Sequence, residues 1–117
     1  MNPGDRRADI SNAITTSMRR FYGKGPERAR TYFNDDNVVC VLEGGLTTAE
    51  ETLLSAGLEQ TIRRYREQFQ EVVAAELMRA VAEATGRDVL TYHSQMLFRP
   101  TRIFEIFVLD AAPDGEG

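Results

Sequence analysis

Apolar residues recur at steps of three and four positions over the first part of the chain, which is the spacing of one face of a helix. They are Ile10, Ala13, Ile14, Met18 and Phe21. We therefore expect a helix over about residues 7–22, preceded by a flexible leader at residues 1–6. Gly23 ends this helix and Pro26 prevents it from restarting.

The pattern then changes to a two-residue alternation, which is typical of a half-exposed β-strand at residues 28–34. Residues 38–42 form a second strand that is apolar throughout, and the Asp-Asp-Asn sequence between the two supplies turn chemistry. The two stretches predict a β-hairpin. Because the second strand is apolar on both faces, we expect it to be more central in the sheet than the first.

A second helical region follows two glycines. Two overlapping sequences fit a capping box, Thr47 with Glu50 and Thr48 with Glu51. Gly57 is expected to divide the region into a short arm and a long arm, the latter running over residues 58–85 and ending at Gly86. The long arm carries an apolar stripe on one side and charged residues on the other, which favours packing on a sheet.

Two further β-rich stretches, at residues 88–98 and 102–110, flank Pro100 and predict a second hairpin. The sequence therefore indicates a single α+β domain over residues 7–110. Its order is helix, β-hairpin, long interrupted helix and β-hairpin, with a four-stranded, mainly antiparallel sheet that helices cover on one face. Residues 111–117, which are rich in Pro, Gly and acids, are expected to form a disordered tail.

The last strand is apolar on both of its faces and is interrupted only by Glu105. One layer of helices covers one face of a sheet, so the second face requires another cover. A second copy of the chain is the most economical cover. We therefore expect a homodimer, formed through the sheet faces or through the long helix.

Composition narrows the class of protein. The chain has 117 residues, of which 42% are hydrophobic and 27% charged, as in ordinary folded domains. No apolar run approaches the length of a membrane-spanning helix, and the polar N-terminus lacks a signal-peptide core, so we expect a cytoplasmic protein that does not span a membrane. Cys40 and His93 are the sole cysteine and histidine, which excludes an ordinary zinc site within one chain, and we expect no metal and no cofactor.

A basic loop stands out against the net charge of −4. It comprises Gly23, Lys24, Gly25 and Pro26 and is followed by Arg28. Backbone N–H groups beside these cations could hold a small anion, or the loop could simply turn the chain. It is not a nucleotide-binding P-loop, because it follows a helix instead of opening one and lacks Ser or Thr after the lysine.

Catalytic groups are not apparent. His93 and Ser94 are neighbours in a predicted strand and so point to opposite faces, which argues against a Ser–His pair. Arg63, Arg64 and Arg66 stand among glutamates and are expected to form a solvated helix face. We therefore expect a protein that is not an enzyme.

Taken together in order and spacing, these features resemble the MpsC-type family, a bacterial domain family named for a sodium-translocating, membrane-potential-generating system. The basic loop at residues 23–26 matches the family pattern, as does the helix start formed by Leu46, Thr47 and Glu50, and His93 with Ser94 follows. The resemblance covers about residues 10–110. The chain departs from the family at Gln95, where an aspartate is usual, and at residues 99–101, where Thr, Gly and Glu are frequent.

The resemblance implies a non-enzymatic accessory or regulatory protein of a bacterial membrane ion or inorganic-carbon transport system. Such a protein would act by dimerisation and by docking on a transport protein. The basic loop would be an anion or partner contact, and Thr47, Glu50, His93 and Ser94 would contribute to a polar site. Because Gln95 stands where the family usually has an aspartate, the contribution of that aspartate to the site would be missing in this chain.

The alternative is a KH-like nucleic-acid-binding module, which shares the order of helix, two strands, two helices and strand. Such a domain needs a GxxG loop between its paired helices to clamp a phosphate backbone. The residues around Gly57 include no second glycine and no basic residue. Stable nucleic-acid binding is therefore not expected.

Overall fold

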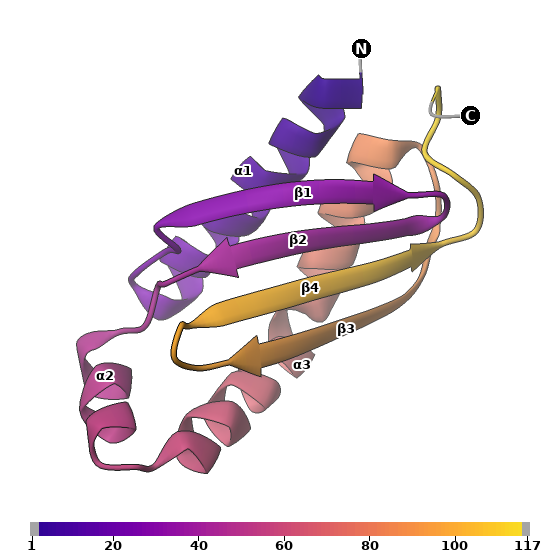
Figure 1. Cartoon of the computed structure of the whole chain (residues 1–117). Coiled ribbons are helices and arrows are strands. Elements are labelled where there is room, and N and C mark those ends of the chain that lie inside the picture. Colours follow the sequence, from indigo (N-terminus) through magenta and orange to yellow (C-terminus); the bar gives the residue numbers. More distant parts are fainter. Residues whose placement is uncertain (1–2, 116–117) are drawn as a thin grey trace.

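The computed structural model describes residues 3–115, which form three helices and four strands. The elements are α1 (Pro3–Tyr22), β1 (Arg28–Asn34), β2 (Asn37–Glu43), α2 (Thr48–Ser55), α3 (Glu59–Thr85), β3 (Val89–Leu97) and β4 (Arg102–Leu109). Their arrangement is an α+β fold with a long helix between two hairpins, which confirms the predicted fold class (Figure 1).

The four strands form one antiparallel sheet in the order β1-β2-β4-β3. β2 lies inside the sheet and β1 at its edge, as the apolar pattern of β2 predicts. The register aligns four residues, which we call the polar row, across the sheet: Thr31, Cys40, Glu105 and Ser94. Because the four occupy equivalent positions in neighbouring strands, they share one face of the sheet.

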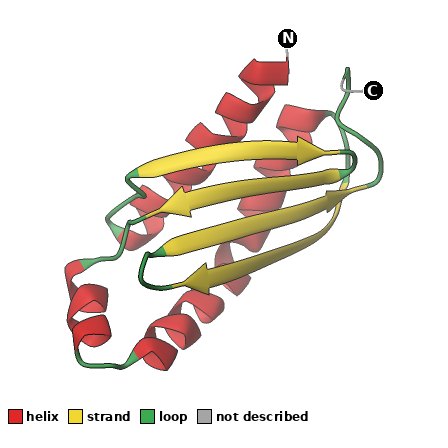
Figure 2. Cartoon of the chain, in the orientation of Figure 1, coloured by secondary structure: helices red, strands yellow, loops and turns green. Residues whose placement is uncertain are grey.

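Both long helices lie on that same face of the sheet, whereas α2 lies beyond the ends of the strands (Figures 1 and 2). Fully buried residues of α1, α3 and the sheet form the core between the layers, among them Ile10, Ile14, Leu42, Leu77 and Phe107. Cys40 is also buried there, as expected for a thiol that packs like a small hydrophobic residue. Within residues 3–115, no helix lies over the other face of the sheet.

Local signals define the helical boundaries where the sequence predicts them. The capping box at α2 is the one formed by Thr47 and Glu50, with the side chain of each accepting a hydrogen bond from the backbone of the other. Gly57 separates α2 from α3 in a left-handed conformation with φ of 76°. Gly86, with φ of 69°, ends α3 and donates its N–H to the carbonyl of Ala82.

The N-terminal boundary differs from the prediction. α1 begins at Pro3, so residues 3–6 belong to the helix, and the flexibility of the leader stays a prediction; residues 1 and 2 lie outside the described part of the chain. The guanidinium of Arg6 donates hydrogen bonds to the carbonyls of Ala84 and Thr85, at 3.3 and 3.0 Å. The last carbonyls of α3, which have no partner within the helix, thus hold the start of α1, a long-range contact that composition does not reveal.

The C-terminal segment, for which the sequence predicts a disordered tail, contacts the end of α3. Pro113 is buried, and the N–H of Asp114 donates to the carbonyl of Thr85 at 2.9 Å. Arg87 donates to the carbonyl of Ala112 at 2.6 Å and pairs with the carboxylate of Asp114 at 3.1 Å. The end of α3 and Arg87 thus supply partners to Ala112 and Asp114, and the disorder of the tail stays a prediction; residues 116 and 117 lie outside the described part.

Candidate functional site

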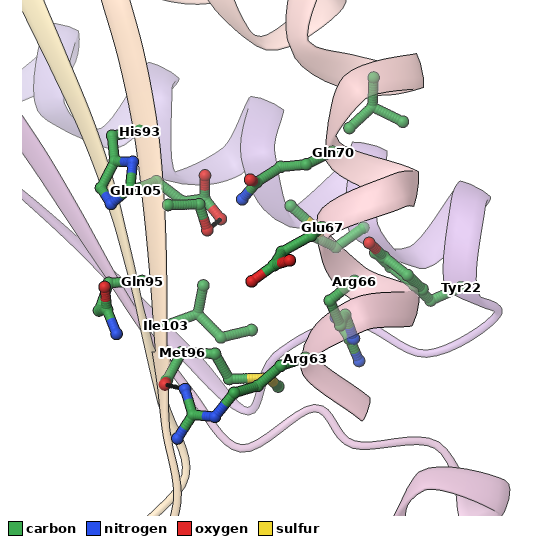
Figure 3. Close-up of a pocket in the computed structure, with 13 residues that line it drawn as sticks. Tyr22, Arg63, Arg66, Glu67, Gln70, His93, Gln95, Met96, Ile103 and Glu105 are labelled. Atoms are coloured by element: carbon green, nitrogen blue, oxygen red, sulfur yellow. Dashed lines mark hydrogen bonds between the residues drawn. The ribbon is translucent and has the colours of Figure 1, made fainter. Parts of the chain in front are cut away.

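A cavity of about 190 Å³ lies between α3 and the β3–β4 edge of the sheet, and the C-terminal part of α1 closes one side of it. Met18, Val73, Met96 and Ile103 form its apolar walls. Charged and polar side chains from α3 and from the sheet also line it (Figure 3). A concave site with apolar walls and a few polar groups has the general character of a small-molecule site.

Glu105 is a buried acidic residue that lines this cavity, and it is only 1% exposed. It belongs to the polar row and lies between Ile103 and Phe107 along β4, both of which are buried. Its carboxylate accepts hydrogen bonds from the hydroxyls of Ser94, at 3.0 Å, and of Tyr92. Burial raises the pKa of Glu105 to about 7, although these hydrogen bonds act in the opposite direction.

Tyr92 is held in place by the neighbouring strand. Its ring stacks on that of Phe107, with centroids 4.9 Å apart and an angle of 20° between the planes. Burial, followed by the charge of Glu105, raises the pKa of Tyr92 well above its usual value. The tyrosine is therefore a hydrogen-bond donor to Glu105 throughout the neutral range.

A buried ion pair, Arg66 with Glu50, connects α3 to the start of α2. Nε and Nη2 of Arg66 each donate to one carboxylate oxygen of Glu50 at 2.6 Å, which is a bidentate geometry. Nη2 also donates to the carbonyl of Gly45 at 3.3 Å, and the guanidinium lies 3.9 Å from the ring centroid of Tyr22. The residues are 8% and 3% exposed, respectively.

The electrostatics of this pair follow from its burial. Burial alone would raise the pKa of Glu50, but hydrogen bonds from Arg66 and Thr47 outweigh it and lower that pKa. Burial alone would likewise lower the pKa of Arg66, and its contacts with Glu50 raise it instead. Both groups are therefore charged at neutral pH. Burial also raises the pKa of Tyr22, beneath the guanidinium, to about 12.

The basic loop lies next to the segment that leads into α2. Gly23 adopts φ of 80° and donates its N–H to the carbonyl of Arg19 at 2.9 Å. A Cβ atom on Gly45 would lie 3.0 Å from Cα of Pro26, so the two backbones can approach only without that side chain. Lys24 is exposed, and Arg28 lies 3.6 Å from the carboxylate of Glu43.

The four residues of the suggested polar site fall in three different places. Thr47 and Glu50 cap α2, and Glu50 also pairs with Arg66, whereas Ser94 donates to Glu105. His93 is exposed on the opposite face of β3, toward the sheet surface without helices, and also borders the cavity mouth. Gln95 shares this exposed side, so the usual aspartate of the family would not stand beside Ser94.

Sequence reasoning missed the centre of the site. Arg66 was expected on a solvated helix face, which is wrong, because it continues the inward-facing series of α3 between Ile62 and Val73. Glu105 was noticed as the interruption of an apolar strand but was not proposed as a site residue. A lone acid on the core-facing side of a central strand is the signal that identifies it.

Two features are absent from the described residues. No group of three or more His, Cys, Asp or Glu side chains is placed to hold a metal ion within residues 3–115. Over the same part of the chain, none of the helices combines the length and apolar character needed to cross a membrane.

The fold and site define an α+β protein with an antiparallel sheet covered on one face and a buried carboxyl beside a small cavity. The sequence model of the MpsC family, described as a Na⁺-translocating membrane potential-generating system, matches residues 2–111. The chain therefore belongs to the MpsC family, as its motifs predict. No curated protein and no solved structure matches it.

Proposed function

We propose that this protein is a non-enzymatic accessory or regulatory component of a bacterial membrane ion or inorganic-carbon transport system, and that it works as a homodimer. Family membership supports the link to membrane ion transport. The observation that carries the mode of action is the uncovered face of the sheet. A protein that acts by assembly needs such a surface, whereas catalysis would need a set of reactive groups.

The uncovered face has an apolar centre and a polar border. We call its central residues the apolar stripe: Val39 and Val41 of β2 with Phe104, Ile106 and Val108 of β4. All five are partly exposed. Tyr32 and Leu97, which are 51% and 44% exposed, extend the stripe on its two sides. Arg30, His93 and Gln95 lie toward the edges.

An apolar centre with a polar rim is the usual anatomy of a protein interface. A second copy of the chain is the occupant that the geometry favours, because a two-fold axis between two such faces places one apolar stripe against the other. The outer surface of α3 is a poorer candidate. Val72, which is 78% exposed, is its most exposed apolar residue, and its neighbours one turn away include Gln68, Ala75 and Glu76.

Replacing Ile106 with aspartate is expected to dissociate the dimer. An acid at the centre of the interface would lose apolar contact and leave a charge without a partner, and we expect the dimer to weaken by at least about thirtyfold. Light scattering coupled to size-exclusion chromatography measures the result, as a change from twice the chain mass of 13.2 kDa to that mass itself.

Val72→Asp is the matched control for this substitution, since it places the same charge on an exposed apolar position of α3. We expect this variant to remain dimeric. A wild-type chain that is monomeric at all concentrations would contradict the proposed dimer. Dissociation by Val72→Asp but not by Ile106→Asp would place the interface on the long helix instead.

The basic loop is the proposed contact with a transport protein or with a small anion. Lys24 is exposed at its tip, and the close packing of Pro26 on Gly45 gives the loop a fixed shape. A rigid, basic and exposed segment can contact an acidic protein surface with little loss of conformational entropy.

Lys24→Glu is therefore expected to reduce recovery of the partner. The measurement is affinity purification of the tagged chain from solubilised membranes of the native host, followed by mass spectrometric identification of the transport-protein subunits recovered with it. Arg64→Glu, at an exposed position on α3, is the control with the same charge change. Equal recovery of transport subunits by the two variants would exclude the loop as the contact, and recovery of none by the wild type would contradict the proposed role.

A further inference from the structure

We propose that the cavity between α3 and the β3–β4 edge binds a small organic cation of the alkylammonium class. Its charged end would contact Glu105 and Glu67, and its hydrocarbon end would lie against the apolar walls. This inference concerns the interior of one chain and is independent of the proposed dimer and of the transport partner.

Oxygen acceptors converge on the cavity from both of its sides. Glu105 points into it from the sheet, while Glu67 and Gln70 extend from α3 toward the sheet (Figure 3). No hydrogen bond or ion pair joins Glu67 to another residue within the described part of the chain. Tyr92 and Ser94 each donate one hydrogen bond to Glu105, so the carboxylate can accept further bonds from a ligand.

The two arginines that line the cavity already have partners. Arg66 is held by both carboxylate oxygens of Glu50, on the side of Tyr22. Arg63 donates to the carbonyl of Met96, and its guanidinium lies 4.9 Å from the ring centroid of Phe98. Among the described residues, no ion pair compensates the carboxylates of Glu67 and Glu105. An anion would meet two carboxylates there, whereas an ammonium group would compensate the buried charge of Glu105.

The walls distinguish an organic cation from a metal ion. Met18, Val73, Met96 and Ile103 surround the acceptors, and such side chains contribute nothing to the coordination of a hard cation. They do contribute contact area to a hydrocarbon chain. The volume of about 190 Å³ corresponds to roughly six water molecules at their share of liquid volume, which suits a ligand of roughly six to ten non-hydrogen atoms.

The test uses three probes that share one hydrocarbon chain: hexylammonium, 1-hexanol and hexanoate. Each is titrated into ¹⁵N-labelled protein at constant pH and ionic strength, and chemical shifts of amides in α3, β3 and β4 are followed by NMR. We expect saturable shifts with hexylammonium, and affinity at least about tenfold lower for hexanol and hexanoate, because both lack a charged donor.

Glu105→Gln keeps the size of the side chain and is expected to weaken hexylammonium binding by at least about tenfold, with little effect on hexanol. Glu67→Gln provides a second test at an exposed position, where folding is not at risk, and should weaken hexylammonium by about threefold. Hexanoate binding as tightly as hexylammonium, or unchanged hexylammonium affinity in both variants, would overturn the proposal. Molecular mass measured on the same samples reports the dimer separately.

Discussion

Replacing Arg66 with methionine is expected to lower the free energy of unfolding by about 3–5 kcal/mol, because the substitution leaves the carboxylate of Glu50 buried without its cation. Glu50 is only 3% exposed, and Arg66 donates to both of its oxygens at 2.6 Å. The carbonyl of Gly45 and the ring of Tyr22 also lose their contacts with the guanidinium. Urea denaturation followed by circular dichroism measures the change.

The double variant Glu50→Gln with Arg66→Met separates the charge from the packing. Glutamine retains an oxygen that can accept the N–H of Thr47 and so preserves the helix cap. We expect the double variant to regain much of the lost stability, since no buried charge remains. Arg64→Met, on the exposed side of α3, should change stability by less than about 0.5 kcal/mol. If Arg66→Met also lowered the free energy of unfolding by less than about 0.5 kcal/mol, the assigned role of the ion pair would be refuted.

Local signals account for the success of the sequence in predicting the fold. The alternation over residues 28–34 gives β1 its observed bounds, because a half-exposed edge strand shows a period of two. Thr47, Gly57 and Gly86 mark helix boundaries through caps and left-handed backbone conformations. Each of these signals acts within a few residues, so the sequence displays it directly.

The site escaped prediction because its contacts join distant parts of the chain. Glu50 and Arg66 lie 16 positions apart on two helices, and their pairing depends on the turn at Gly57. Glu105 meets Ser94 through the register of β3 and β4, across a separation of 11 positions. Periodicity identifies the covered face of each element, but it does not specify which polar residues on two covered faces come together.

Hydrogen bonds compensate the burial of the polar row under the helices. A hydrogen bond of 2.8 Å joins the hydroxyls of Thr31 and of Ser11 in α1, and Ser94 donates to Glu105. Cys40, between them, is a thiol with a pKa that burial raises to about 11, so it adds no charge. Glu105 is thus the one member of the polar row whose charge changes near neutral pH.

The groups that face Glu105 come from every layer around it. They are Tyr22 of α1, Cys40 of β2, Arg66 and Glu67 of α3, and Tyr92 and Ser94 of β3. Burial dominates over these neighbours and raises the pKa of Glu105 to about 7. An unfolded glutamate has a pKa of about 4.3. Between these two values the folded chain therefore holds a proton that the unfolded chain has released.

The stability of the protein is consequently expected to fall as the pH rises through this window. Because the native state binds the extra proton, the contribution of Glu105 is fully present at acid pH and is lost above about pH 7. Glu105→Gln lacks this dependence. Urea denaturation measures the free energy of unfolding of both proteins. The value for the variant minus that for the wild type should therefore rise by about 2–3 kcal/mol between pH 5 and pH 8. A difference between the two proteins that stays constant over this range would show that Glu105 ionises at its ordinary pKa in the fold.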